Sequence, residues 1–260
     1  MTNVIKSILW YITKPDYYSE LSRVALILIK EKLHISKNTK KQTIYTKNMY
    51  RKIAISTEEA IFKLTGKKKF SLIRNIFKKE FFESEEKERK FPVKMGGAAN
   101  LDLLYHLAEH LQAKKVIETG IASGWSSLSI LLSLQKREHS ILISTDKPYP
   151  GMNNETYVGS IVPSKLKEKW KIIKLPDRKA IPKSIKLLKE VDLCHYDSDK
   201  TYEGRTWSYP RLWRSLRKGG IFISDDIGDN LGFHNFCKKI RKKPMIVENN
   251  GNFVGVLIKD

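Results

Sequence analysis

The sequence predicts an α/β protein built on a doubly wound, mostly parallel sheet. From Lys114 onward, short runs rich in β-branched residues alternate with helical stretches, which is typical of parallel strands joined by crossover helices. Two further runs then flank Asn250 and Gly251, a dipeptide that favours a tight hairpin turn. The sheet is therefore expected to close with a C-terminal antiparallel hairpin strand.

The strand-like runs and one late helix give the expected order of elements. Parallel strands are assigned to Lys115–Glu118, Ile141–Thr145, Lys171–Lys174, Val191–Tyr196 and Gly220–Ser224. A helix over Phe233–Arg241 and a hairpin pairing Met245–Glu248 with Phe253–Ile258 follow. Residues 91–260 are thus expected to form one domain, and residues 1–90 a basic helical N-terminal extension.

The extension carries apolar side chains at helical spacing. The first stripe consists of Ile5, Ile8, Leu9 and Ile12, and the second of Leu21, Val24, Leu26, Ile27 and Leu33. Further helices are expected from Thr57 and over Phe70–Phe82. Such stripes predict helices that pack on the main domain or on a subunit partner. Because lysines accompany them, docking of residues 1–90 on an anionic membrane is an alternative, and contact with nucleic acid is another.

Charge and cysteine content narrow the choice of partners and compartment. The chain of 260 residues has 49 Lys and Arg against 28 Asp and Glu, which gives a formal net charge of +21. Residues 1–94 contain 22 Lys and Arg but only 10 Asp and Glu. This excess favours anionic partners such as nucleic acid, phospholipid head groups or acidic glycans. Cys194 and Cys237 lie far apart and predict neither a disulfide framework nor a zinc site. We expect a cytoplasmic protein, with a peripheral membrane location as an option, and a homo-oligomer is one allowed assembly.

A glycine-bearing turn follows the first predicted strand. Gly120 and Gly124 lie between that strand and a helix over Leu128–Leu134, at the carboxyl end where open α/β sheets bind ligands. Glycine lets the backbone approach a ligand at angles that a side chain forbids. The second strand ends at Asp146, 22 residues after Gly124, where an acidic side chain can accept hydrogen bonds from ribose hydroxyls.

Acidic residues also follow the fourth and fifth predicted strands. Asp197 and Lys200 come after the fourth strand, and Asp225 and Asp226 after the fifth. Adjacent parallel strands would bring these carboxylates together, where they would repel one another unless a cation or protonation relieved them. A hard divalent ion such as Mg²⁺ prefers carboxylate oxygens, so the pattern predicts a metal site.

The segment from Ile117 to Gly124 resembles the first motif of the class I S-adenosylmethionine-dependent methyltransferases, which have a Rossmann-like fold. The resemblance covers about residues 91–260. It implies that S-adenosylmethionine is the cofactor and that the cofactor-binding residues are Glu118, Gly120, Ala122, Gly124, Asp146 at the ribose and Asp177 near the adenine. Pro176 departs from the pattern, because a glycine usually precedes that last acid. The segment from Gly96 to Asn100 is similar to one that closes over the cofactor in relatives.

The acidic cluster resembles that of the cation-dependent O-methyltransferases of the catechol and caffeoyl-coenzyme A type. The resemblance implies Asp197 and Asp225 as metal ligands, and Asp226 at a position usually held by Asn, where it keeps an oxygen ligand but adds charge. Lys200 matches the lysine that accepts the proton of the substrate hydroxyl. For that role its pKa, about 10.4 in water, must be lowered by a nearby cation and by burial.

The expected function is transfer of a methyl group to a hydroxyl of a small molecule or glycan, assisted by Mg²⁺ or a similar divalent cation. A nucleic-acid methyltransferase is the first alternative, but the fourth strand ends in Tyr196-Asp-Ser-Asp rather than the Asn/Asp-Pro-Pro-aromatic tetrad of amino-methylating relatives. A non-catalytic binding module is the second. His195 is expected to be a packed core histidine, and Trp207 to be either a core residue or a wall of the substrate pocket.

Overall fold

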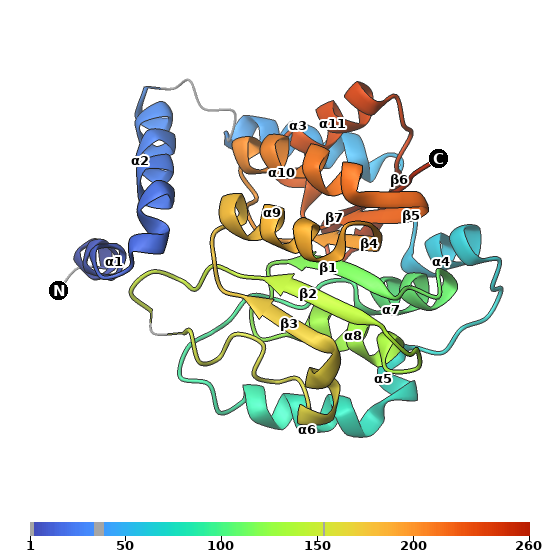
Figure 1. Cartoon of the computed structure of the whole chain (residues 1–260). Helices are drawn as coiled ribbons and strands as arrows, with labels where there is room; N and C mark the ends of the chain where they lie inside the picture. Colours follow the sequence, from blue (N-terminus) through green and yellow to red (C-terminus); the bar gives the residue numbers. More distant parts are fainter. Residues whose placement is uncertain (1–2, 34–38, 153) are drawn as a thin grey trace.

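The chain folds into a seven-stranded mixed sheet with helices on both faces (Figure 1). The computed structural model describes residues 3–33, 39–152 and 154–260. The strands are β1 (Lys115–Thr119), β2 (Ile141–Thr145), β3 (Trp170–Ile173), β4 (Val191–Tyr196), β5 (Leu216–Ser224), β6 (Met245–Asn249) and β7 (Asn252–Ile258). Their order in the sheet is β3-β2-β1-β4-β5-β7-β6.

The strand order confirms the predicted fold class and creates a ligand-binding edge. Strands β1 to β5 pair in parallel, and the order reverses between β1 and β4. Such a reversal opens a crevice at the carboxyl ends of the strands. Strand β7 runs antiparallel to both β5 and β6, as predicted. The hairpin turn places Asn250 at φ 50° and Gly251 at φ 80°, the backbone conformation that this dipeptide favours.

Helices cover the sheet on both sides and extend beyond its strand ends (Figure 1). The α-helices are α1 (Asn3–Ile12), α2 (Tyr18–Lys32), α3 (Lys40–Arg51), α4 (Thr57–Thr65), α5 (Ile73–Ile76), α6 (Lys78–Glu88), α7 (Leu101–His110), α8 (Trp125–Leu134), α9 (Asp177–Leu188), α10 (Tyr202–Ser215) and α11 (Gly232–Ile240). Helices α9, α10 and α11 lie on one face and α7 and α8 on the other (Figure 1).

Alternating side chains of the central strands fill two separate cores. Val116 of β1 packs in the cluster that contains α7 and α8, whereas its neighbour Ile117 packs in the cluster that contains α9, α10 and α11. Successive side chains of a strand point to opposite faces, so a sheet covered on both faces buries most of its side chains, and most of these are apolar. This explains the continuous apolar runs that identified the strands.

The extension is helical, as predicted, but residues 39–88 pack into the main body. Ala60 and Ile61 of α4 are fully buried in the same core as α7 and α8. The Ile55 N–H donates to the Ile246 carbonyl of β6 at 3.0 Å, which adds a bridge at the edge of the sheet. The domain boundary at residue 90 stays a prediction, and residues on both sides of it share one core.

Two details of the predicted extension are wrong. The helix expected over Phe70–Phe82 is split at Phe77, whose φ of −120° and ψ of 49° end α5 before α6 begins. In the stripe predicted for α1, Leu9 and Ile12 are exposed, whereas Trp10 is buried against the ring of Tyr17. Aromatic packing outweighs the aliphatic spacing there, because large rings bury more apolar surface than Leu or Ile.

Across the described part of the chain, no helix combines the length and the apolar character that a membrane crossing requires.

Candidate active site

A cavity of about 590 Å³ lies at the carboxyl ends of the parallel strands, at the crevice created by the reversed strand order. This volume is typical of a site for a small molecule. The walls come from the loops after β1, β2, β4 and β5 and from α2 of the extension. Of the predicted residues, those lining it are Gly96, Gly97, Ala98, Ala99, Gly120, Ala122, Asp146, Asp177, Asp197, Lys200, Trp207, Asp225 and Asp226.

The turn after β1 requires glycine at position 120. Gly120 has φ 81°, and a Cβ atom there would lie 2.5 Å from the carbonyl oxygen of Asp197. Its N–H donates to the Thr145 carbonyl at 2.8 Å, which holds the turn against the end of β2. The predicted approach of this backbone to a ligand stays a prediction. The approach seen here is to the chain after β4, and it brings the turn next to the acidic cluster.

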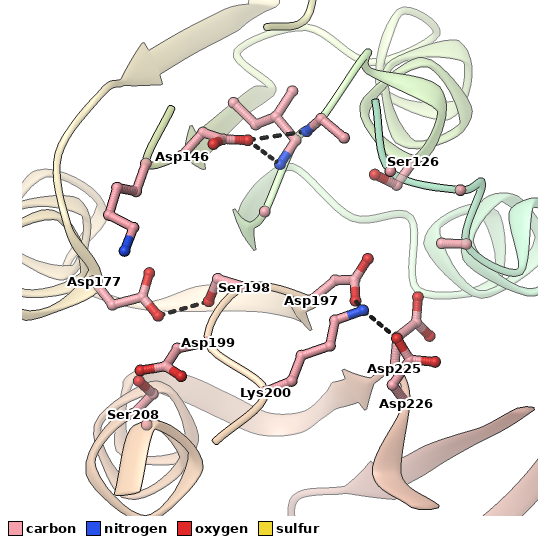
Figure 2. Close-up of a pocket in the computed structure, with 18 of the residues that line it drawn as sticks. Ser126, Asp146, Asp177, Asp197, Ser198, Asp199, Lys200, Ser208, Asp225 and Asp226 are labelled. Carbon is pink, nitrogen blue, oxygen red and sulfur yellow. Dashed lines mark hydrogen bonds and ion pairs between the residues drawn. The ribbon is translucent and has the colours of Figure 1, made fainter. Parts of the chain in front are cut away.

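Asp146 fixes the shape of this turn. One carboxylate oxygen, Oδ2, accepts hydrogen bonds from the N–H groups of Ile121 and Ala122 at 2.7 and 2.9 Å (Figure 2). Burial raises the pKa of Asp146, and the two N–H bonds partly offset that effect. The side chain also lines the cavity, so it is placed both to brace the turn and to contact a ligand.

Two predicted cofactor residues lie behind the cavity instead of lining it. Glu118 is completely buried, and its Oε2 accepts hydrogen bonds from the hydroxyls of Ser127 and Ser144. Gly124 has φ 114°, and a Cβ atom there would lie 3.1 Å from the Cα of Gly159, so this glycine permits close chain packing. Both residues support the turn from behind, and neither is among those that line the cavity.

Asp177 lies at the cavity wall, as the resemblance implies. It starts α9, and its Oδ2 accepts a hydrogen bond from the Ser198 hydroxyl at 2.6 Å (Figure 2). Burial raises the pKa of Asp177 to about 7, although the Ser198 bond lowers it. This contact ties the start of α9 to the loop after β4, which carries the acidic cluster.

Of the three aspartates predicted from the fourth and fifth strands, Asp197 and Asp226 pair with Lys200, and Asp225 pairs with His195. The Lys200 Nζ lies 2.8 Å from Oδ1 of Asp197 and also pairs with Asp226, so one ammonium bridges the ends of two neighbouring strands (Figure 2). Burial would lower the pKa of Lys200, but the charges of Asp197 and Asp226 outweigh it and raise the pKa. These two carboxylates favour the charged form of the side chain, and the base role that the resemblance implies stays a prediction.

Asp197, like Asp177, has a pKa near neutrality, and it is the one that lies beside Lys200. Burial is the largest cause and raises its pKa, and the nearby charge of Asp225 raises it further. The charges of Lys200 and His195 act in the opposite direction, and the pKa is about 7. A carboxyl group with such a pKa exchanges a proton readily at physiological pH.

His195 is buried, as predicted, but it is more than a packed core residue. Its Nε2 lies 3.2 Å from Oδ2 of Asp225, and its Nδ1 lies 3.5 Å from Oε1 of Glu118. Burial would lower the pKa of His195, whereas the two carboxylates raise it to about 10. The imidazolium therefore connects the acid at the cofactor turn with the acid after β5.

The residues present do not fit a divalent cation as they stand. Carboxylate oxygens are suitable ligands for Mg²⁺. However, Lys200 already pairs with Asp197 and Asp226, and His195 pairs with Asp225. Within residues 3–33, 39–152 and 154–260, no group of three or more His, Cys, Asp or Glu side chains is arranged to hold a metal ion. The charge repulsion that suggested a metal is relieved here by the chain's own cations.

Sequence reasoning missed two cavity residues on α2. Glu20 and Arg23 both line the cavity, and Arg23 Nη1 lies 2.9 Å from Oδ2 of Asp199 in the loop after β4. Glu20 Oε1 lies 3.0 Å from the Nζ of Lys147, in the loop after β2. The extension thus supplies part of the wall. No local pattern could reveal this, because more than a hundred residues separate the paired groups.

Sequence comparison matches the core of this region to a known family. Residues 117–227 match the family model of a methyltransferase domain. The matched segment runs from β1 to the start of the loop after β5, and it contains Gly120, Asp146, Asp197, Lys200 and Asp225. No curated protein matches the chain in sequence.

Structure comparison finds the same fold in several solved methyltransferases. An O-methyltransferase from Bacillus cereus, solved with S-adenosylhomocysteine, has a TM-score of 0.54 and 11% identity, over 81% of this chain and 100% of that one. The O-methyltransferase TomG from Streptomyces achromogenes, solved with S-adenosylmethionine, has a TM-score of 0.53 and 13% identity, over 70% of this chain and 90% of TomG. A methyltransferase from Podospora anserina, bound to S-adenosylhomocysteine, has a TM-score of 0.52 and 14% identity, over 70% of this chain and 88% of that one. The chain therefore has the class I fold of S-adenosylmethionine-dependent methyltransferases, and its residues 117–227 match a methyltransferase domain.

Proposed function

We propose that this chain is an S-adenosylmethionine-dependent O-methyltransferase that acts on a hydroxyl group of a small molecule or glycan. The observation that carries the proposal is the cavity itself. A braced glycine turn of the kind that binds a nucleoside cofactor lies directly against a loop with an acid of near-neutral pKa. The family match and the solved relatives support the same cofactor.

In this proposal Asp197 accepts the proton of the substrate hydroxyl. The hydroxyl oxygen attacks the methyl carbon of the sulfonium, the new O–C bond forms as the C–S bond breaks, and the bonding electron pair stays on sulfur. The proton moves to the Asp197 carboxylate, whose pKa of about 7 suits a general base at neutral pH. Lys200 keeps its proton and stabilises the negative charge that develops on the oxygen, a change from the base role that the resemblance implies.

The Asp197→Asn variant tests this assignment. We expect its kcat to fall by about 100-fold or more, the typical contribution of a general base, with little change in the affinity for S-adenosylmethionine. Wild-type kcat should rise with pH through about 7, because the deprotonated carboxylate is the active form, and the variant should lack this rise. Transfer of a labelled methyl group to a panel of hydroxylated acceptors provides the assay.

Glu203→Gln is the matched control, since it neutralises an acid of α10 that does not line the cavity. Full activity in Asp197→Asn would contradict the proposed base. Methyl incorporation into RNA, with none into small hydroxylated acceptors, would favour a nucleic-acid methyltransferase instead.

A divalent cation, which the resemblance implies, could bind the three aspartates only if Lys200 moved away from them. We therefore expect wild-type protein to show no saturable binding of Mn²⁺ in an electron paramagnetic resonance titration. The Lys200→Met variant removes the competing ammonium and leaves two carboxylates exposed to any cation, so it should gain Mn²⁺ binding. Tight Mn²⁺ binding by the wild type that the Asp225→Ala variant loses would show that the site is a metal site after all.

A further inference from the structure

Helix α2 has an inner face that belongs to the cavity wall. Glu20 and Arg23 form an ion pair with each other at 2.6 Å and connect the helix to Lys147 and Asp199 of the main domain. Tyr17, just before the helix, donates its hydroxyl to the Lys174 carbonyl at 2.7 Å. These contacts fix one side of α2 against the body of the protein, so its opposite side must face outward.

The outward side of α2 is apolar. Tyr18, Leu26, Ile29 and Leu33 recur at helical spacing on one side of the helix, and Ile12 at the end of α1 adjoins them, because the Tyr18 hydroxyl donates to the Ile12 carbonyl at 2.8 Å. These five residues, here called the outer stripe, are each between 50% and 62% exposed. A row of large aliphatic side chains in water is unfavourable unless a partner covers it.

Lysines border the outer stripe on both sides. With 3.6 residues per turn, Lys30 falls on one side of the line through Leu26, Ile29 and Leu33, and Lys32 falls on the other. Lysine side chains next to an apolar face can extend their ammonium groups toward negative charge while their stems cover apolar surface. This is the pattern of a helix that lies in the interface of an anionic bilayer.

We propose that the outer stripe docks this protein on an anionic lipid bilayer. Charge complementarity selects this occupant: the chain carries a net charge of +21, which opposes the approach of a second copy and favours a surface of acidic head groups. Nucleic acid also attracts lysines, but its phosphates offer nothing to cover Leu26, Ile29 and Leu33. A bilayer would cover the aliphatic row and place acidic head groups near Lys30 and Lys32.

Docking in this way would place the cavity immediately behind the membrane-facing helix. Glu20 and Arg23 of this helix line the cavity, whereas the outer stripe is exposed. Figure 1 shows α2 at one side of the molecule. The proposal does not depend on the methyl-transfer reaction, since it rests on the exposed face of α2 alone. If both hold, the acceptor hydroxyl would be presented at or near the membrane surface.

The test is co-sedimentation of the full-length protein with vesicles of phosphatidylcholine mixed with phosphatidylglycerol, compared with vesicles of phosphatidylcholine alone. We expect the wild type to bind the anionic vesicles. The Leu26→Ser, Ile29→Ser double variant should bind them about tenfold more weakly or worse, because it removes aliphatic groups that would enter the acyl region. Phe82→Ser on α6, a change of similar size at another exposed site, should bind like the wild type.

The contribution of the lysines is measured separately. The Lys30→Glu, Lys32→Glu variant should bind anionic vesicles at least about tenfold more weakly, and added salt should weaken wild-type binding, as expected for charges near a lipid surface. Affinity for S-adenosylhomocysteine, measured on each preparation, should stay unchanged, since none of these substituted residues lines the cavity. That control separates failure of docking from failure of the cofactor site or of folding.

Equal vesicle binding by the wild type and the Leu26→Ser, Ile29→Ser variant would overturn the proposal. Failure of the wild type to bind anionic vesicles would also overturn it. If light scattering then showed a wild-type dimer that the double variant cannot form, the outer stripe would be an interface between two copies of the chain. Salt-sensitive retention on RNA that requires Lys30 and Lys32 but not Leu26 and Ile29 would assign the surface to nucleic acid.

Discussion

Replacing Gly120 by valine is expected to lower the free energy of unfolding by about 3 kcal/mol or more and to abolish binding of S-adenosylhomocysteine. Two effects add: a branched residue at φ 81° is strained by about 1–2 kcal/mol, and the new side chain meets the Asp197 carbonyl, which overpacks the turn by roughly 1–3 kcal/mol. Relief of the clash must move either the turn or the loop after β4. Both line the cavity, so binding is lost with stability.

Thermal unfolding with and without S-adenosylhomocysteine measures both effects. Wild-type protein should unfold at a higher temperature when the ligand is present, whereas Gly120→Val should show a lower melting temperature and no response to ligand. Gly97→Ala is the matched control, because it also lies at the cavity but a Cβ atom there would meet nothing within 4 Å. A ligand response of normal size in Gly120→Val would mean that this turn is not the cofactor site.

Replacing His195 by phenylalanine is expected to destabilise the protein by about 3–5 kcal/mol. The imidazolium lies between Glu118 and Asp225, and its removal leaves two buried carboxylates without their cation. The ring of phenylalanine fills a similar volume, so the loss of stability would come mainly from the missing charge and not from poorer packing. His106→Phe is the control, since His106 is also buried but contacts the Ser71 carbonyl instead of two carboxylates.

The destabilisation should depend on pH in one direction. The pKa of His195 is raised from 6.5 to about 10 in the folded protein, so its stabilising effect is fully present below pH 6.5. It is lost as the pH rises through about 10 and the imidazole loses its proton. Urea unfolding of wild type and His195→Phe should therefore differ most at neutral or lower pH and converge in alkali. A pH-independent difference would show that His195 is a neutral packing residue.

Most of the sheet could be predicted from the sequence because the evidence for it is local. The bounds predicted for Ile141–Thr145 and Val191–Tyr196 agree with the structure to the residue, since strands covered on both faces are rich in apolar and β-branched side chains. The turn at Asn250 depends on two residues only. The carboxyl ends of neighbouring parallel strands always share one edge, so the meeting of Asp197 with Asp225 and Asp226 also followed from strand order.

The pKa shifts and ion pairs of the site residues could not be predicted, because they depend on side chains that are distant in the sequence. Asp226, from another strand, pairs with Lys200 and helps to raise its pKa. The pKa of His195 is raised because Asp225 and Glu118, both distant from it in the sequence, lie beside its ring. The contact of Arg23 with Asp199 joins the extension to the cavity. Composition could suggest that the extension is basic, but not which face it turns inward.

The extension and the site are therefore connected through one helix. Arg23 holds α2 against the loop that carries Asp199 and Lys200, and the same loop lies beside the Gly120 turn. Substitutions on the inner face of α2 should therefore change ligand binding in the cavity, whereas substitutions in the outer stripe should not. This separation allows the cofactor site and the docking surface to be tested independently in one protein.

We propose that the braced turn at Gly120 and Asp146 binds the methyl donor. Isothermal calorimetry with S-adenosylmethionine tests it most directly, by comparing the wild type with Asp146→Ala, which removes the acceptor of the Ile121 and Ala122 N–H groups. We expect one molecule of S-adenosylmethionine to bind per wild-type chain, and the variant to bind at least about tenfold more weakly, since a charge-assisted hydrogen bond contributes about 1.5–3 kcal/mol. Absence of binding to the wild type, or equal affinity in both proteins, would contradict the account.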